Sequence, residues 1–140
     1  MVEVLRIEPE RAQRFVDAHE REALRALYGF AVVPLEERIA LGATENGEIA
    51  GIASLRIAAS LGHLDAIVVA RELRRRGIGR ALVERACELA NYYNCHKMTA
   101  TVPLESGAER FLVACGFSRE CVLAQHAYKV DAAVMRLFLL

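Results

Sequence analysis

Residues 64–86, which read LDAIVVARELRRRGIGRALVERA, hold most of the information in this chain. The run Leu64–Val69 is almost wholly apolar, which is typical of a strand buried on both faces. Beyond Gly77, apolar residues recur on one helical stripe, which predicts an amphipathic helix. Between the two lies Arg74–Arg80, with four arginines and two glycines among seven residues. The stretch therefore predicts a strand, a basic glycine-containing turn and a helix, in that order.

The basic turn is expected to bind an anion. The first backbone amides of a helix have no intrahelical acceptor, and together with the helix dipole they attract negative charge. Gly77 and Gly79 allow a tight turn and a close approach of a ligand, and the arginines suit a polyanion such as a pyrophosphate. Two common phosphate loops do not fit. The P-loop requires Lys and Ser or Thr where Arg80-Ala81 stands, and the dinucleotide fingerprint requires glycine at Leu82.

Hydrophobic periodicity and turn residues predict the other elements. Helices are expected to begin at Pro9, near Gly77 and at Ser106, and the first should end at Gly29. Asn46-Gly47 is the strongest short hairpin signal in the chain. Residues 32–37 are compatible with a loop or with a short helix near Pro34. The expected strands cover residues 2–7, 39–44, 49–57, 64–69, 98–102, 117–124 and 128–138.

A chain of 140 residues without linkers or repeats is expected to form one domain, residues 1–140. Hairpins combined with strand–helix–strand crossovers predict an α/β fold with a mixed sheet and helices on its faces. The 18 basic and 18 acidic residues cancel, so the whole molecule has no bias toward nucleic acid or anionic membranes.

The cysteines and the N-terminus indicate the compartment. The four cysteines form no C-x-x-C pair and no zinc-like spacing with histidine, so we expect free thiols and no metal site. The first residues, MVEVLRIEPER, lack the apolar segment of a signal peptide. No apolar run approaches the roughly 18 residues of a membrane span. A cytoplasmic protein without a membrane partner is therefore expected.

The motif R-x-x-G-x-G at Arg74–Gly79 resembles the coenzyme A signature of the GNAT acetyltransferases. The strand that ends in Ile67-Val68-Val69 stands at the distance typical of that family. Downstream, residues 108–117 (AERFLVACGF) are similar to the family's A-x-x-F-Y-x-x-x-G-F element. The resemblance implies a mostly antiparallel, twisted sheet of six or seven strands with helices on both faces. It also implies an enzyme that moves acetyl from acetyl-coenzyme A directly to a primary amine of a small molecule or peptide.

The resemblance assigns roles to particular residues. Asp65 stands where the family often has an acidic base, and Glu105 replaces an asparagine near the pantetheine arm, so both are candidate catalytic residues. His63 and His126 are interpreted as surface or structural histidines. The strand segment would pair with pantetheine, the turn would hold the pyrophosphate, and the later helix would line the pantetheine side. These coenzyme A-binding candidates are Ile67, Val68, Val69, Arg74, Arg75, Arg76, Gly77, Ile78, Gly79, Arg80, Ala108 and Phe111.

Two features leave alternatives open. Leu112 stands where the family often has the tyrosine that protonates the departing thiolate. Another residue or water could replace this acid, the step could proceed without one, or the chain could be a non-catalytic acyl-coenzyme A sensor or partner module. The segment Ala132–Leu140 is unusually apolar for the end of a chain and, if left exposed, would form an aggregation-prone strand edge, which predicts a homodimer that buries it.

Overall fold

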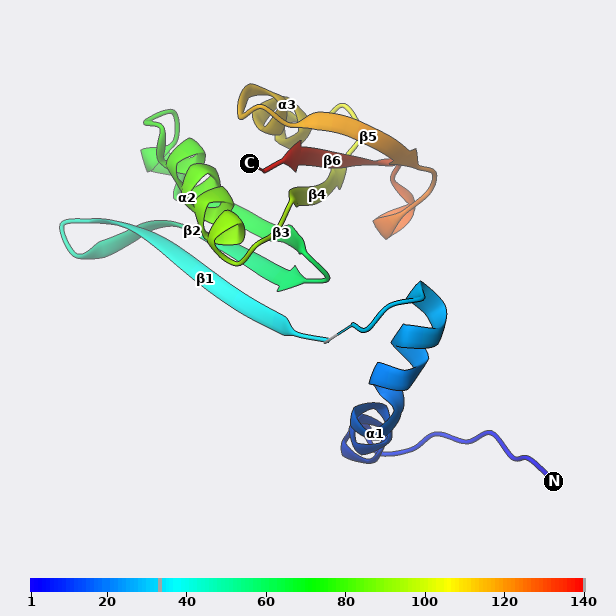
Figure 1. Ribbon diagram of the computed structural model, residues 1–140. Coiled ribbons are helices and arrows are strands. Elements are labelled where there is room, and N and C mark those ends of the chain that lie inside the picture. The colour runs from blue at the N-terminus through cyan, green and yellow to red at the C-terminus, as the bar shows by residue number, and fades with distance from the viewer. Residues whose placement is uncertain (33, 140) are drawn as a thin grey trace. The chain divides into compact units, whose positions relative to one another are not determined.

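The computed structural model describes residues 1–32 and 34–139, which belong to two compact units, Met1–Leu35 and Glu36–Leu140 (Figure 1). The first unit contains one helix, α1 (Pro9–Tyr28). Pro9 lies in its first turn, where the missing N–H costs no hydrogen bond. Gly29 ends the helix in the left-handed conformation, with φ 80°, and its N–H donates to the carbonyl of Arg25. Both expected helix ends are therefore confirmed.

The second unit is a six-stranded mixed sheet with two helices. Its strands lie in the order β1-β2-β3-β4-β6-β5, and β3–β4 is the parallel pair in an otherwise antiparallel sheet. The helices are α2 (Ile78–Tyr92) and α3 (Gly107–Ala114). The mixed, mostly antiparallel sheet is as expected. The strands are β1 (Glu36–Glu45), β2 (Glu48–Ala58), β3 (Leu61–Val69), β4 (Lys97–Pro103), β5 (Ser118–Leu123) and β6 (Ala132–Phe138).

Tight turns set the registers of the first three strands. Asn46 and Gly47 both have positive φ, as a two-residue hairpin turn requires. The β2–β3 turn is built the same way on Ala59 and Ser60, which also have positive φ. Short 3₁₀ segments, Arg71–Leu73 and Ala127–Lys129, complete the connections.

Helices α2 and α3 pack on the same face of the sheet. A side chain placed at Gly51 of β2 would meet Ile78 and Leu82 of α2, and one at Gly62 of β3 would meet Ala90. Helix α3 packs over β4 and β6, and its Leu112 belongs to the same buried cluster as Val83, Met98 and Met135. One core therefore joins both helices to the sheet. Helix coverage of the opposite face stays a prediction.

Strands β3 and β4 part after a short parallel ladder. They pair only from Leu61–Leu64 against Lys97–Ala100. Just beyond that ladder β3 carries a bulge, because Leu64 faces Leu55 while Ala66 faces Ser54, and Asp65 is the extra residue. A bulge bends its strand and increases the local twist. The last five residues of β3 therefore turn away from β4, with their backbone edge on that side outside any ladder.

Two expectations need correction, and one open alternative is decided. Residues 2–7 form no strand: apolar alternation supplies β propensity, but a strand also needs a partner, and no described ladder includes this segment. Residues 34–35 are not helical, and Val33 lies outside the described residues. The last strand begins at Ala132, so Tyr128 lies in the short 3₁₀ segment before that strand and is exposed.

The apolar end of the chain also has a different explanation from the one expected. Strand β6 lies between β4 and β5 and pairs with both, so it is not a sheet edge. Ala132, Ala133 and Met135 are buried within this chain. Burial within this chain therefore explains their apolar character without a second subunit. The homodimer stays a prediction, but the apolar segment no longer supports it.

Candidate active site

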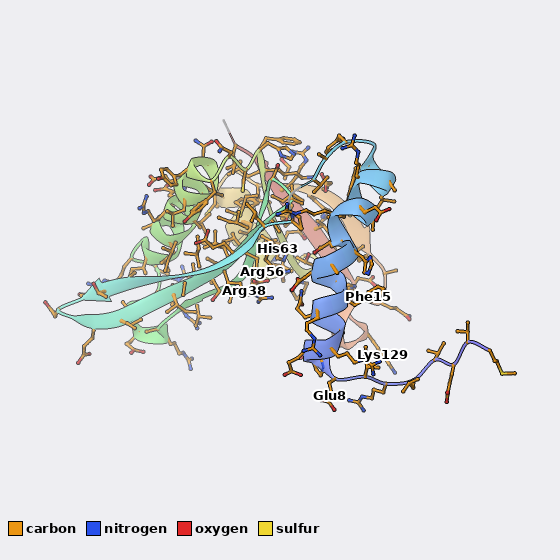
Figure 2. All side chains as sticks on the ribbon, turned by 60° about the horizontal axis from the view of Figure 1, so that its bottom comes forward. Glu8, Phe15, Arg38, Arg56, His63 and Lys129 are labelled. Carbon is orange, nitrogen blue, oxygen red and sulfur yellow. The ribbon has the colours of Figure 1, made fainter. Side chains whose placement is uncertain are left out.

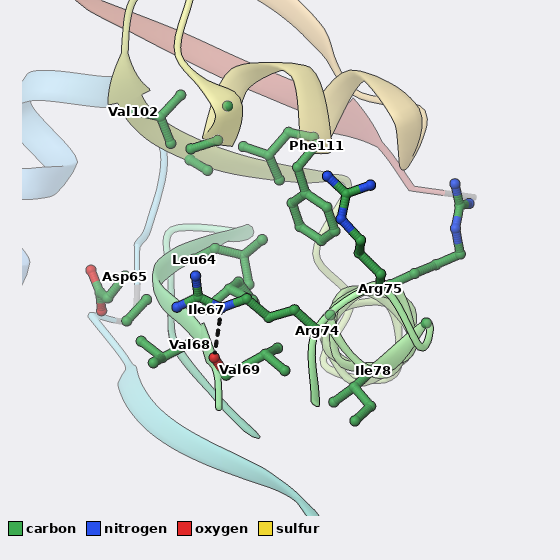
Figure 3. A pocket seen from close by; sticks show the side chains of 18 of the residues that line it. Leu64, Asp65, Ile67, Val68, Val69, Arg74, Arg75, Ile78, Val102 and Phe111 are labelled. Carbon is green, nitrogen blue, oxygen red and sulfur yellow. Dashed lines mark hydrogen bonds between the residues drawn. The ribbon is translucent and has the colours of Figure 1, made fainter. Parts of the chain in front are cut away.

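A cavity of about 850 Å³ opens where β3 and β4 part (Figure 3). Its walls come from the diverging ends of both strands, the N-terminus of α2 and the first turns of α3. The cavity has Asp65 at one end and the arginines of the basic turn at the other. It is lined by residues 64–69, Leu73, Arg74, Arg75, residues 77–80, Ala100, Thr101, Val102, Gly107, Ala108, Phe111 and Leu112.

The arginine end of the cavity has the chemistry of an anion site. Gly77 precedes α2 with φ 79° and ψ 6°, a left-handed conformation that favours glycine. The first turn of α2 carries no acidic residue, so no side chain on the helix competes for its free amides. Arg74 is held against the end of β3, since its Nε donates to the Val69 carbonyl at 3.1 Å. Arg80 donates to the carbonyl of Ala114 at 2.7 Å, at the end of α3.

Arg76 is the member of the basic turn that does not line the cavity. Its guanidinium makes two hydrogen bonds to the Glu45 carboxylate, at 3.1 and 3.3 Å, on the β1–β2 hairpin. Consecutive arginines cannot all face one ligand, because the backbone turns between them. The structure thus gives Arg76 a part in holding the turn against the hairpin.

Gly79 lets α2 and α3 approach closely over the cavity. A Cβ at this position would lie 3.2 Å from Cζ of Phe111 and 3.3 Å from its Cε1. Contacts this short would force the ring to move. The second glycine of the motif therefore sets the position of Phe111, one wall of the cavity.

At the other end, Asp65 belongs to a polar cluster on β2, β3 and β4. Nε of Arg56 lies 3.0 Å from Oδ1 and 2.9 Å from Oδ2 of Asp65. This hydrogen bond is the largest cause lowering the pKa of Asp65 below its usual value. Asp65 is therefore ionised at neutral pH, and it is a weaker base than an unpaired carboxylate.

His63 stands next to that carboxylate. Its Nε2 lies 3.9 Å from Oδ1 of Asp65, and its Nδ1 lies 2.8 Å from the hydroxyl of Thr99. The Thr99 hydroxyl donates to the Gly62 carbonyl at 3.4 Å, so we infer that it accepts from Nδ1–H and that Nε2 is free to accept a proton. Burial is the largest effect on the imidazole and lowers the pKa of His63 despite the nearby Asp65. His63 is thus neutral near pH 7.

Glu105 does not line the cavity. It has φ 58° in the turn before α3, and its N–H donates to Oε1 of Glu109 at 2.7 Å. Glu109 is 5% exposed, and its carboxylate also binds Arg119 of β5 through Nε at 2.6 Å and Nη2 at 2.9 Å. Glu109 therefore fixes the turn from which α3, with Gly107, Ala108 and Phe111, reaches the cavity.

This ion pair predicts an acid-sensitive fold. The hydrogen bond from Arg119 lowers the pKa of Glu109 below its ordinary 4.5. A depressed carboxyl pKa contributes stability above the unfolded-state value, and that stability is lost as pH falls through the folded-state value. Glu109→Gln should therefore melt below wild type at pH 7, and the gap should narrow below pH 4.5. Melting curves from pH 3 to 7 measure this, with Glu88→Gln on the exposed face of α2 as control. If the difference in melting temperature between Glu109→Gln and wild type is the same at every pH, the predicted role of the ionised carboxylate is wrong.

The sequence did not predict the neighbours of Asp65. Arg56 and His63 are nine and two residues away, and the pairing of β2 with β3 brings them together. The β4 wall was also missed, because only the parallel ladder identifies β4 as the neighbour of β3. Alternation did offer one signal: polar residues at 54, 56, 63 and 99 interrupt otherwise apolar strands.

Two further features are absent from the described part of the chain. There, no group of three His, Cys, Asp or Glu side chains is arranged to hold a metal ion. Among the same residues, no helix combines the length and hydropathy that crossing a membrane requires. Cys115 lies at the end of α3, where burial raises the pKa of its thiol, so it is not an activated nucleophile.

The mixed sheet, the parted strands and the basic turn before α2 are the arrangement that the resemblance to the GNAT acetyltransferases leads one to expect. The profile of the acetyltransferase (GNAT) family matches residues 4–117, and the chain belongs to this family. An acetyltransferase from Bacillus cereus has the same fold, with a TM-score of 0.75 at 14% identity, over 99% of this chain and 98% of that one. The GNAT-family acetyltransferase of Streptococcus pneumoniae is 28% identical, with a TM-score of 0.65, over 73% of this chain and 66% of that one.

A third structure, from Bacillus anthracis, is a complex with acetyl coenzyme A. It shares 19% identity and a TM-score of 0.69 with this chain, over 73% of this chain and 62% of the other. The likeness extends the agreement in fold to a protein with that ligand bound.

Proposed function

We propose that this protein is an acetyl-coenzyme A-dependent N-acetyltransferase that moves an acetyl group directly to a primary amine. One observation carries the proposal: a single cavity connects an anion site, an open strand edge and the Asp65 carboxylate, which has His63 beside it. Membership of the GNAT family supports the same donor.

The residues around the cavity fit coenzyme A in order. The free amides of α2 and the guanidinium groups of Arg74, Arg75 and Arg80 suit the pyrophosphate. The backbone of Ile67–Val69 has an unpaired edge on the cavity side, so a pantetheine amide can pair with it as an added strand would. Ala108 and Phe111 supply the apolar wall across from that edge.

The acceptor amine enters beside Asp65 and His63. Asp65 is ionised and attracts the ammonium form, and the 3.9 Å between its Oδ1 and His63 Nε2 leaves both atoms within reach of one nitrogen. Neutral His63 takes a proton from that nitrogen at Nε2. The neutral amine then forms a bond to the acetyl carbon, its nitrogen releases a second proton to water, the carbon–sulfur bond breaks, and the thiolate leaves. Of the two candidate catalytic residues, this proposal assigns Asp65 to amine binding and leaves Glu105 outside the reaction.

The departing thiolate receives no proton from position 112, because Leu112 is buried in the core and carries no acidic proton. A coenzyme A thiolate is a stable leaving group, so water can protonate it after departure. General acids contribute about 10²- to 10⁴-fold, and the absence of this one lowers the rate by at most part of that range.

The missing tyrosine also supports a second candidate, a non-catalytic acyl-coenzyme A-binding module. Release of free thiol from acetyl-coenzyme A over a panel of amines separates the two. Thiol release that depends on the amine supports the enzyme. Tight binding without release in the presence of any amine supports the binding module.

Acetyl-coenzyme A should raise the melting temperature of the protein. A ligand at about 100 times its Kd stabilises the folded state by about 2.7 kcal/mol, which corresponds to several degrees for a domain of this size. NAD and ATP at the same concentration should raise it less, because the turn lacks their phosphate-loop motifs. Thermal melts with each nucleotide measure the effect. A shift with NAD equal to that with acetyl-coenzyme A would contradict the proposed donor.

A further inference from the structure

A row of basic side chains crosses the face of the sheet opposite α2. Arg38 of β1 lies directly across from Arg56 of β2, which lies directly across from His63 of β3. Figure 2 shows the three side chains following one another across these strands. Both arginines act on the Asp65 carboxylate at the end of the cavity and help to keep it ionised. The row therefore borders the place where the acceptor amine would enter.

Arg56 is only partly used by its neighbours. It contacts both oxygens of Asp65 through Nε, and no other hydrogen bond of its guanidinium is found among the described residues. Its two Nη groups thus retain the planar, two-pronged geometry that suits a carboxylate or phosphate. Arg38 is 74% exposed at its side chain and has a loose ion pair with Glu36 at 3.4 Å.

Beside the Asp65 end of the cavity, opposite charges therefore lie side by side. Asp65 offers a negative group beside the neutral imidazole, and the far end of the Arg56 guanidinium offers a positive group adjoining Arg38. The two charged groups are in direct contact. The Arg56 guanidinium bonds Asp65 through Nε, and its two Nη groups remain available to an anionic group.

We propose that the acceptor is a primary amine carrying an anionic group close to its nitrogen, with a free α-amino acid as the representative of the class. The ammonium group binds Asp65 beside His63, and the carboxylate binds the Nη groups of Arg56 with help from Arg38. This inference rests on the proposed acetyl transfer and adds the class of acceptor. An amine with a second positive charge would instead meet two arginines, and an uncharged one would leave Arg56 without its partner.

The test compares three amines that share one side chain: leucine, leucinamide and isoamylamine. Leucinamide loses its proton more readily than leucine and isoamylamine less readily, so a preference for leucine over both cannot come from basicity. We expect kcat/KM for leucine to exceed both others by about tenfold or more, the size of one charge-assisted hydrogen bond. An equal or higher kcat/KM for leucinamide or isoamylamine would overturn the inference. Phosphoethanolamine in the same assay distinguishes a phosphate-bearing acceptor from a carboxylate-bearing one.

A substitution tests whether the row of Arg38, Arg56 and His63 causes the preference for leucine. Arg38→Gln should reduce the ratio of leucine to leucinamide by about tenfold, whereas Arg85→Gln on α2 should leave this ratio as in wild type. If the ratio of kcat/KM for leucine to that for leucinamide is unchanged in Arg38→Gln, Arg38 does not help to bind the acceptor. Calorimetry with coenzyme A present separates this inference from the proposed function. If leucine binds more tightly than leucinamide but is not acetylated, the proposed acetyl transfer is wrong and the inferred ligand class stands. If the two bind equally, the inferred class is wrong.

Discussion

We expect Gly77→Val to raise the Kd of acetyl-coenzyme A by more than about 100-fold while the protein stays folded. Gly77 has φ 79°, and apart from its chain neighbours no protein atom lies within 4 Å of a Cβ built on it, so the added Cβ causes no clash. A β-branched residue is strongly disfavoured at this φ, and the turn would shift to relieve the strain. Such a shift moves the free amides of α2 that would hold the pyrophosphate.

The chain offers a matched control for this substitution. Gly29, at the end of α1, has φ 80° and likewise nothing within 4 Å of a built Cβ. Gly29→Val should therefore cost a similar amount of stability and leave the Kd of acetyl-coenzyme A unchanged. Calorimetry and circular dichroism on both variants measure the two effects. Wild-type affinity in a folded Gly77→Val protein would show that the turn does not hold the phosphates.

The second large effect is expected for His63→Asn. Asparagine can keep the hydrogen bond to Thr99 but has no group that accepts a proton near neutral pH. We expect kcat to fall by about 10²-fold at pH 7, the lower range for a general base. The pKa of His63 is lowered, so the wild-type rate should rise with pH through a value below 6.5, and this step should vanish in the variant. Above pH 9 the gap should narrow, because more of the amine is already neutral.

Asp65→Asn separates base from binding group. If Asp65 holds the ammonium, the variant should raise KM for the amine by a similar factor at every pH, while the Kd of acetyl-coenzyme A stays unchanged. The groups that act on His63 are Asp65 and Arg56, so the His63 pKa should also fall when the carboxylate is removed. A pH-dependent loss in Asp65→Asn with none in His63→Asn would make Asp65 the base.

Much of the fold follows from local signals. Pro9 and Gly29 mark the ends of α1, Asn46-Gly47 forms the first hairpin, and the turn at Arg74–Arg80 joins β3 to α2. Each of these depends on the conformation of one or two residues, which the residue type itself restricts. Residues 2–7 show the limit, since their apolar pattern favours a strand and yet nothing local specifies which strand would pair with them.

The site, too, has one part that local sequence predicts and one part that depends on strand pairing. Its anion end is contiguous in sequence, so a motif could predict it, apart from Arg76, whose partner Glu45 is 31 residues away. Its polar end is assembled across β1, β2, β3 and β4. His63 is distinguished from an ordinary surface histidine only by Thr99 on one side and Asp65 on the other. Cross-strand registers create that environment, and the sequence does not state them.

The bulge at Asp65 makes the shape of the cavity sensitive to the deletion of a single residue. Leu64 and Ile67 face the helices from positions three apart, because one residue is looped into the strand between them. Removing that residue would make Leu64 and Ala66 consecutive, restore a regular ladder against β2, and remove the bend that carries the strand away from β4. Substitutions at position 65 would change the chemistry of the cavity but keep its shape. Loss of a single codon would close the sheet.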